Sequence, residues 1–181
     1  MQLEFRRDFE DVQARWDRFW RGESPRPHVY GVAPKQGVEP VPKPGYTAGH
    51  DGNFGPVIDQ VLRWAETHDF VGDAIPFFQI EFGADHFVTF LGADLRFQEG
   101  SVRETGNSWA VPFVEDWDET EIRFRRDTVW WERAEAFADE LRSRCDGRLL
   151  IAAPTFVANA DALAAIRGRE SARGRLVLDS D

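Results

Sequence analysis

Apolar residues recur at three- and four-residue steps in four parts of the chain, the spacing that amphipathic helices show. This pattern predicts helices over residues 5–21, 54–67, 128–144 and 160–166. Gly22 and Gly147 follow the first and third of these segments, where a glycine commonly ends a helix. Trp16 and Trp20 lie on the apolar side of the first helix, so we expect both to cover the core rather than to stack on a ligand.

Short apolar runs between these segments predict strands at residues 28–33, 74–80, 95–98, 108–114 and 149–153. The run 149–153 shows no polar alternation, which indicates burial on both faces, as in a parallel sheet. The runs 95–98 and 108–114 are joined by a polar segment and suggest a hairpin-like excursion. The recurring order of strand, loop and helix therefore predicts an α/β fold with a parallel sheet.

Residues 70–94 read as a strand, a turn and a short helix that ends at Gly92. Polar residues follow this strand, and in α/β folds ligands bind at the carboxyl ends of strands. Gln79, Glu81, Asp85 and His86 are therefore the first candidates for a binding site. The alternative is that Asp85 caps the helix and that His86 is a surface residue.

Residues 31–56 form a long loop, because eleven of these 26 positions are glycine or proline. Long ordered loops in compact domains are commonly binding loops or lids. Tyr46 and Phe54 give this loop side chains to pack with, so we expect it to fold over one end of the domain. The alternative is a disordered linker.

Composition restricts the classes of partner. A net charge of −10 repels nucleic acid and anionic membranes, so we expect neither as a partner. The charged first 22 residues do not resemble a signal peptide, and no apolar run approaches the length of a membrane span. We therefore expect a soluble, cytoplasmic protein. Cys145 is the sole cysteine, which leaves no internal disulfide.

Three stretches of the sequence carry a family resemblance. RWDRFWRGESPRP at 15–27, GDAIPFFQIEFGADHFVTFLGADLRFQEG at 72–100 and DGRLLIAAPTFVANADALAAIRG at 146–168 resemble, in this order, the uroporphyrinogen decarboxylase superfamily. This superfamily includes carboxy-lyases and corrinoid-dependent methyltransferases, and its members are complete (β/α)₈ barrels. The resemblance implies the N-terminal part of such a TIM barrel over residues 1–168, truncated after about the first half.

Residues 169–181 differ from this pattern and form a charged tail, in which Leu176, Val177 and Leu178 are the one apolar run. An incomplete barrel leaves the edge of strand 149–153 open. We expect a homodimer, or aggregation, through this edge unless the tail covers it.

The family's catalytic residues are not matched. The stretch Phe77-Phe78-Gln79-Ile80 corresponds to the Phe-Ser-Asp-Ile pattern of the decarboxylases, so Gln79 stands in place of the aspartate. An amide forms hydrogen bonds but lacks the negative charge that stabilises a protonated pyrrole. Lys35 lies in the loop that corresponds to the family's arginine-rich loop, which here contains no arginine. We therefore expect no uroporphyrinogen decarboxylase activity.

Nothing in the chain reproduces the zinc ligands of the methyltransferase branch, and Glu81, Asp85 and His86 lack clear ligand spacing. We expect no metal and no cofactor. The predicted function is that of a decarboxylase-like or methyltransferase-like protein, incomplete and inactive alone, with a small-molecule ligand at the strand carboxyl ends. The candidate ligand-binding residues are Lys35, Gln79, Glu81, His86, Thr155 and Asn159, with Gln79 pointing inward alongside Ile75 and Phe77. The alternative is a stand-alone α/β binding module that holds a small apolar or sugar-like ligand with the aromatics of the Pro/Gly loop.

Overall fold

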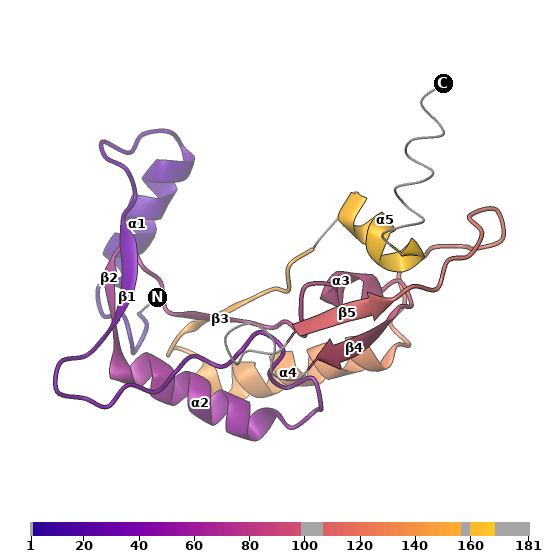
Figure 1. The fold of residues 1–181 in the computed structure, drawn as a ribbon. Coiled ribbons are helices and arrows are strands. Elements are labelled where there is room, and N and C mark those ends of the chain that lie inside the picture. The colour runs from indigo at the N-terminus through magenta and orange to yellow at the C-terminus, as the bar shows by residue number, and fades with distance from the viewer. Residues whose placement is uncertain (1, 99–106, 157–159, 169–181) are drawn as a thin grey trace. The chain divides into compact units, whose positions relative to one another are not determined.

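The computed structural model describes residues 2–98, 107–156 and 160–168 of the 181-residue chain, and these form a mixed α/β protein (Figure 1). The helices are α1 (Phe9–Trp20), α2 (Phe54–Thr67), α3 (His86–Thr89), α4 (Val129–Cys145) and α5 (Ala160–Arg167). The strands are β1 (Tyr30–Pro34), β2 (His68–Gly72), β3 (Phe77–Gln79), β4 (Asp94–Gln98), β5 (Asn107–Val111) and β6 (Leu150–Ala152).

The described residues divide into two compact units. The first unit comprises Met1–Pro44, Asn53–Gln79 and Ala138–Ala152; the second comprises Gly45–Gly52, Ile80–Phe137 and Ala153–Asp181. Each is described here by itself.

The strands pair in three separate two-stranded sheets, and within the described residues no sheet closes into a barrel. β1 and β2 are antiparallel, from Tyr30↔Gly72 to Pro34↔His68. β3 and β6 are parallel, with Phe77↔Leu150, Phe78↔Ile151 and Gln79↔Ala152 as partners. β4 and β5 form the antiparallel hairpin that the sequence predicts. The mixed α/β class is therefore confirmed, whereas the described sheets show one parallel pair rather than a continuous parallel barrel sheet.

Each unit has buried apolar side chains from segments distant in sequence. In the first unit they include Val12 of α1, Ile58 and Val61 of α2, Phe78 of β3 and Leu141 of α4. In the second unit, Val88 and Ala93 pack in one cluster with Val114 and with the inner side of α5. The periodicity of the long helices therefore identified real core positions, and α2 begins and ends where the sequence predicts.

Two expectations about the elements are wrong, and one strand was not predicted. Trp20 is 76% exposed, because the residues of α1 that are fully buried, Phe9 and Val12, lie toward the helix start. The apolar stripe of α1 thus extends beyond the surface it covers. The strand that was not predicted is β2, which follows directly after α2 and precedes the predicted strand at residues 74–80. The central strand β3 is three residues long rather than seven.

The side of β3 that is buried also differs from the expectation. Phe77 and Gln79 do share a face, opposite Phe78, as strand alternation requires. The buried side chain is Phe78, whereas Phe77 is 40% exposed and Gln79 is half-buried. The face expected to point inward is therefore the more exposed one.

Candidate functional site

The residues that the sequence singles out fall into different parts of the structure. Lys35 and Gln79 belong to the first unit, while Glu81, His86 and Thr155 belong to the second. Asn159 lies outside the described residues. The structure brings two of these residues into direct contact, Glu81 and Thr155.

Glu81 and Thr155 occupy equivalent places in the chain, since Glu81 follows β3 by two residues and Thr155 follows β6 by three. Parallel strands end at the same edge of a sheet, so the segments that leave them run side by side. The Thr155 hydroxyl donates a hydrogen bond to the Glu81 carboxylate. Burial raises the pKa of Glu81, and the bond from Thr155 opposes that rise.

Tyr46, from the Pro/Gly loop, lies near the carboxylates of Glu81 and Asp85. Burial is the main cause that raises the pKa of the Tyr46 phenol, and the negative charges of Glu81 and Asp85 raise it further. Its hydroxyl donates to Oδ1 of Asn107. The phenol, two carboxylates and the Thr155 hydroxyl thus form a group of proton donors and acceptors, which we call the Glu81 group. Tyr46 is absent from the predicted site, although its position in the loop is a signal that could have placed it there.

The part of the loop that carries Tyr46 is held in place by two further contacts. The ring of His50 stacks on Phe97 of β4, with ring centroids 3.9 Å apart and planes at 23°. Arg133 of α4 donates from Nη1 to the His50 carbonyl oxygen over 2.6 Å. Residues 45–52 are therefore an ordered part of the second unit, as expected for a binding loop and not for a linker.

Asp85 precedes α3 but makes no side-chain capping bond to it. Its Oδ2 instead accepts a hydrogen bond of 2.9 Å from the amide of Ala110 in β5. The alternative that Asp85 caps the helix is therefore wrong. Through this bond Asp85 ties the start of α3 to the hairpin.

His86 is a core residue, so the alternative that it lies on the surface is wrong. Its side chain is 0% exposed and lies against the rings of Phe82 and Phe90, with centroid separations of 4.6 and 5.0 Å. Burial lowers the pKa of His86 to about 4, because a charged imidazolium is costly in apolar surroundings. The imidazole is therefore neutral at pH 7.

Lys35 and Gln79 of the first unit are both engaged with the backbone of neighbouring elements. Lys35 Nζ donates to the carbonyl of Glu66 over 2.7 Å, and its amide donates to the carbonyl of Thr67 over 2.9 Å. Lys35 therefore caps the carboxyl end of α2, a position that favours a cation. Gln79 ends β3 in register with Ala152.

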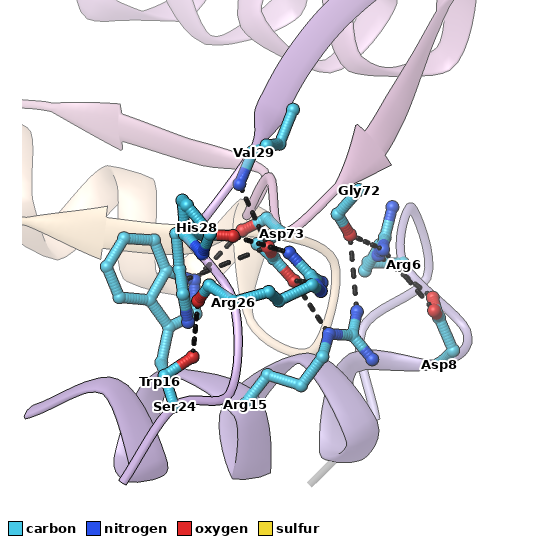
Figure 2. A network of polar contacts seen from close by, with 11 residues as sticks. Arg6, Asp8, Arg15, Trp16, Ser24, Arg26, His28, Val29, Gly72 and Asp73 are labelled. Atoms are coloured by element: carbon cyan, nitrogen blue, oxygen red, sulfur yellow. Dashed lines mark hydrogen bonds and ion pairs between the residues drawn. The ribbon is translucent and has the colours of Figure 1, made fainter. Parts of the chain in front are cut away.

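The most extensive polar network of the first unit surrounds Asp73, a residue that sequence reasoning missed (Figure 2). The Asp73 carboxylate is 0% exposed. It accepts hydrogen bonds from Arg15 Nε at 2.7 Å, from both terminal nitrogens of Arg26 at 2.9 and 3.0 Å, and from the amide of Val29 at 3.1 Å. Trp16 Nε1 donates to the Asp73 carbonyl oxygen over 2.9 Å.

These contacts hold the pKa of Asp73 well below its usual range, with the hydrogen bond from Arg26 as the largest cause. Every oxygen of the carboxylate is occupied, so it has no lone pair directed at a ligand. Asp73 therefore joins α1, the segment after it and the turn that follows β2. The role is structural.

An open hollow of about 470 Å³ lies beside this network in the first unit. Its walls are mostly apolar and come from α1, β1, β3 and β6; they include Trp16, Tyr30, Val32, Ile75 and Phe77. Tyr30 is 67% exposed, an unusual amount for an aromatic side chain of this size. The hollow has the size and lining of small-molecule pockets.

Within the described residues, no three His, Cys, Asp or Glu side chains gather closely enough to hold a metal ion. No helix among them is both long enough and apolar enough to cross a membrane. No protein-family model matches the sequence, and no curated protein or solved structure shows significant similarity to it.

Proposed function

We propose that the chain is the N-terminal part of a uroporphyrinogen decarboxylase-like or methyltransferase-like protein that binds a small molecule at the Glu81 group. The observation that carries the proposal is the hydrogen bond between Glu81 and Thr155, which follow the two parallel strands β3 and β6. Polar residues that follow parallel strands at their carboxyl ends are where α/β proteins bind their ligands.

The chemistry of the Glu81 group is proton transfer and hydrogen bonding. A carboxyl with a raised pKa keeps its proton to a higher pH and can exchange it with a bound ligand. With Gln79 at the place of the family's aspartate, the chain lacks the charge for decarboxylating a pyrrole substrate. The proposed fragment binds a tetrapyrrole-like or corrinoid-like ligand without turning it over.

Calorimetric titration with two probes tests the proposal: coproporphyrin, a tetrapyrrole tetracarboxylate, and hydroxocobalamin, a corrinoid. We expect one of them to bind and to lose about tenfold in affinity, about 1.4 kcal/mol, in each of the variants Glu81→Gln and Thr155→Val. Glu39→Gln alters an exposed carboxylate of the Pro/Gly loop in the first unit and is the matched control. Absence of binding for both probes, or equal losses in the control, contradicts the proposal.

A stand-alone binding module is the second candidate, and the anchoring of residues 45–52 favours it. A module of this kind folds by itself and uses the loop's aromatic residues to hold a small apolar or sugar-like ligand. A cooperative, monomeric melt and a well-dispersed NMR spectrum support this candidate. Binding of the dye ANS together with aggregation supports the incomplete barrel.

A further inference from the structure

The hollow of the first unit is lined by the first residues of three strands. Tyr30, Phe77 and Leu150 contribute to its walls, and they begin β1, β3 and β6 respectively. Residues 73–75, which precede β3, line it as well. The Glu81 group instead follows the carboxyl ends of β3 and β6, so the proposed function leaves the hollow unused.

Hydrogen bonds hold the walls of the hollow in place. Trp16 is fixed through its indole Nε1, which donates to the Asp73 carbonyl oxygen over 2.9 Å (Figure 2). The Asp73 amide donates to the Val29 carbonyl oxygen over 2.8 Å, next to the start of β1. The Leu150 amide donates to the Pro76 carbonyl oxygen over 2.9 Å. A ligand therefore meets walls that are already positioned, which lowers the ordering cost of binding.

The charges of the lining favour an uncharged ligand. Among the described residues that line the hollow, Asp73 alone is charged. Its carboxylate is 0% exposed and already accepts hydrogen bonds from Arg15, Arg26 and the Val29 amide. A charged group in the hollow would lose hydration without gaining a partner of opposite charge.

Three aromatic side chains make the lining suited to a flat ring. Trp16, Tyr30 and Phe77 come from α1, β1 and β3. Tyr30 is 67% exposed and Phe77 is 40% exposed, so both rings have apolar surface that a ligand can remove from water. Aromatic rings also attract one another beyond the burial of area. The volume of about 470 Å³ is in the lower part of the range of small-molecule pockets, roughly 300–1,000 Å³, and suits a molecule of one or two rings.

We propose that this hollow is a binding site for uncharged aromatic molecules of one or two rings, such as indoles and naphthols. The flat ring of the ligand packs against Tyr30 and Phe77, and its edges contact Val32 and Ile151. The site lies in the first unit and does not depend on the Glu81 group.

Calorimetric titration of the full chain with three probes tests the class of ligand. 2-Naphthol is flat and neutral at pH 7, 2-naphthoate has the same rings with a negative charge, and 1-adamantanol is neutral but not flat. We expect 2-naphthol to bind at least about tenfold more tightly than either of the other two. Absence of 2-naphthol binding overturns the proposal, as does binding no tighter than that of either other probe.

Two matched variants of the β1–β2 sheet locate the bound probe. Val32→Trp fills the hollow from β1, whereas Val71→Trp places the same ring on the opposite face of the sheet, because Val71 pairs with Gly31 and Val32 with Phe70. Both valines are exposed, so neither change cuts into the core. We expect Val32→Trp to weaken 2-naphthol binding at least about tenfold and Val71→Trp to leave it unchanged. Equal effects of the two variants place the probe elsewhere and overturn the proposal.

Two substitutions of Tyr30 test the contribution of the aromatic wall. We expect Tyr30→Ala to weaken 2-naphthol binding about fivefold, and Tyr30→Phe, which keeps the ring, to change it less than about twofold. The melting temperature of each variant shows whether the fold persists. Unchanged affinity in a folded Tyr30→Ala variant overturns the proposal. An affinity that falls as the protein concentration rises also overturns it, because a second copy of the chain then occupies the hollow.

Discussion

Asp73 and His86 are both withdrawn from solvent, and their surroundings act on their charge in opposite directions. Two arginines and a backbone amide compensate the Asp73 carboxylate, which therefore remains ionised. His86 is surrounded by the rings of Phe82 and Phe90 and remains neutral. Each side chain links the stability of the fold to pH through the difference between its folded and unfolded pKa.

We expect the pKa of His86 to make the protein less stable in mild acid. The folded pKa of about 4 lies below the unfolded value of 6.5, so the unfolded chain takes up the proton first as the pH falls. The cost is absent above pH 6.5, grows as the pH falls from 6.5 to 4, and reaches about 3 kcal/mol at 1.36 kcal/mol per pKa unit. Urea unfolding at pH 7 and pH 4.5 measures it. His86→Leu should remove most of the difference between these two pH values, and an unchanged difference refutes the assignment.

We expect Asp73→Asn to destabilise the protein by roughly 2–3 kcal/mol. The substitution removes the negative charge that Arg15 and Arg26 face, and it replaces one accepting oxygen of the carboxylate with an NH₂ group that donates. The loss is smaller than the roughly 3–5 kcal/mol that removal of one partner from a fully buried ion pair costs, because Arg26 is half-exposed and can be hydrated. The stabilisation by Asp73 is present above its ordinary pKa of 3.8 and is lost as the pH falls below that value. Asp127→Asn, which alters an exposed pair with Arg125, is the control and should not change the urea midpoint. Equal effects of the two substitutions contradict this view of Asp73.

At the scale of elements, the turn between β3 and α3 depends on close approach to the hairpin. Gly83 has φ of 116°, a conformation that glycine adopts without cost. A Cβ on Gly83 meets Oγ of Ser108 at 1.7 Å, and this hydroxyl donates to the carbonyl of Phe82 over 2.6 Å. The turn therefore needs glycine for its dihedral angle and also for the space that Ser108 occupies.

We expect Gly83→Ala to destabilise the second unit by more than about 1 kcal/mol. This loss should be larger than the loss caused by Gly92→Ala. Both glycines have φ above 110°, but a Cβ on Gly92 meets nothing closer than 3.6 Å, on the flexible side chain of Arg125. The pair separates the cost of the dihedral angle from that of the clash. Denaturant unfolding followed by tryptophan fluorescence gives both values. Equal losses show that Ser108 moves aside at no cost.

The helices could be predicted from the sequence because their pattern extends over many residues, and the hairpin because its two strands are neighbours in the chain. The other two sheets could not, since β2 and β3 pair with strands far away in the chain. Glu81 and Thr155 were identifiable because each follows a strand. Asp73 was missed because its partners, Arg15 and Arg26, are 58 and 47 positions away, and no local pattern encodes such a contact.

At the scale of the molecule, the open edges of the parallel pair β3–β6 are the feature with the clearest consequence. Each strand pairs with the other, and neither pairs with a further described strand. Unpaired strand edges are templates for association with another chain. The residues of β6 are half-buried and apolar, which favours such an association.

We expect the protein to form a concentration-dependent dimer through this edge, and Ile151→Lys to return it to a monomer. A lysine on an edge strand opposes pairing because its charge would be buried between the two chains. Leu163→Lys, on the exposed side of α5, is the matched control and should leave the dimer intact. Light scattering coupled to size-exclusion chromatography gives the mass. A wild-type protein that stays monomeric at every concentration rules out this interface.

The first unit is discontinuous, and this has a consequence for the order of events on the ribosome. β3 ends at Gln79, but its partner β6 begins at Leu150, and Glu4 meets Arg148 from a distance of 144 residues. At a synthesis rate of about 5–20 residues per second, the intervening seventy or so residues take roughly 4 to 14 s to emerge. Throughout that interval β3 has left the exit tunnel without its partner strand. Residues 80–137, which form most of the second unit, are synthesised within the same interval, so the β4–β5 hairpin can form while the first unit still waits for its last strand.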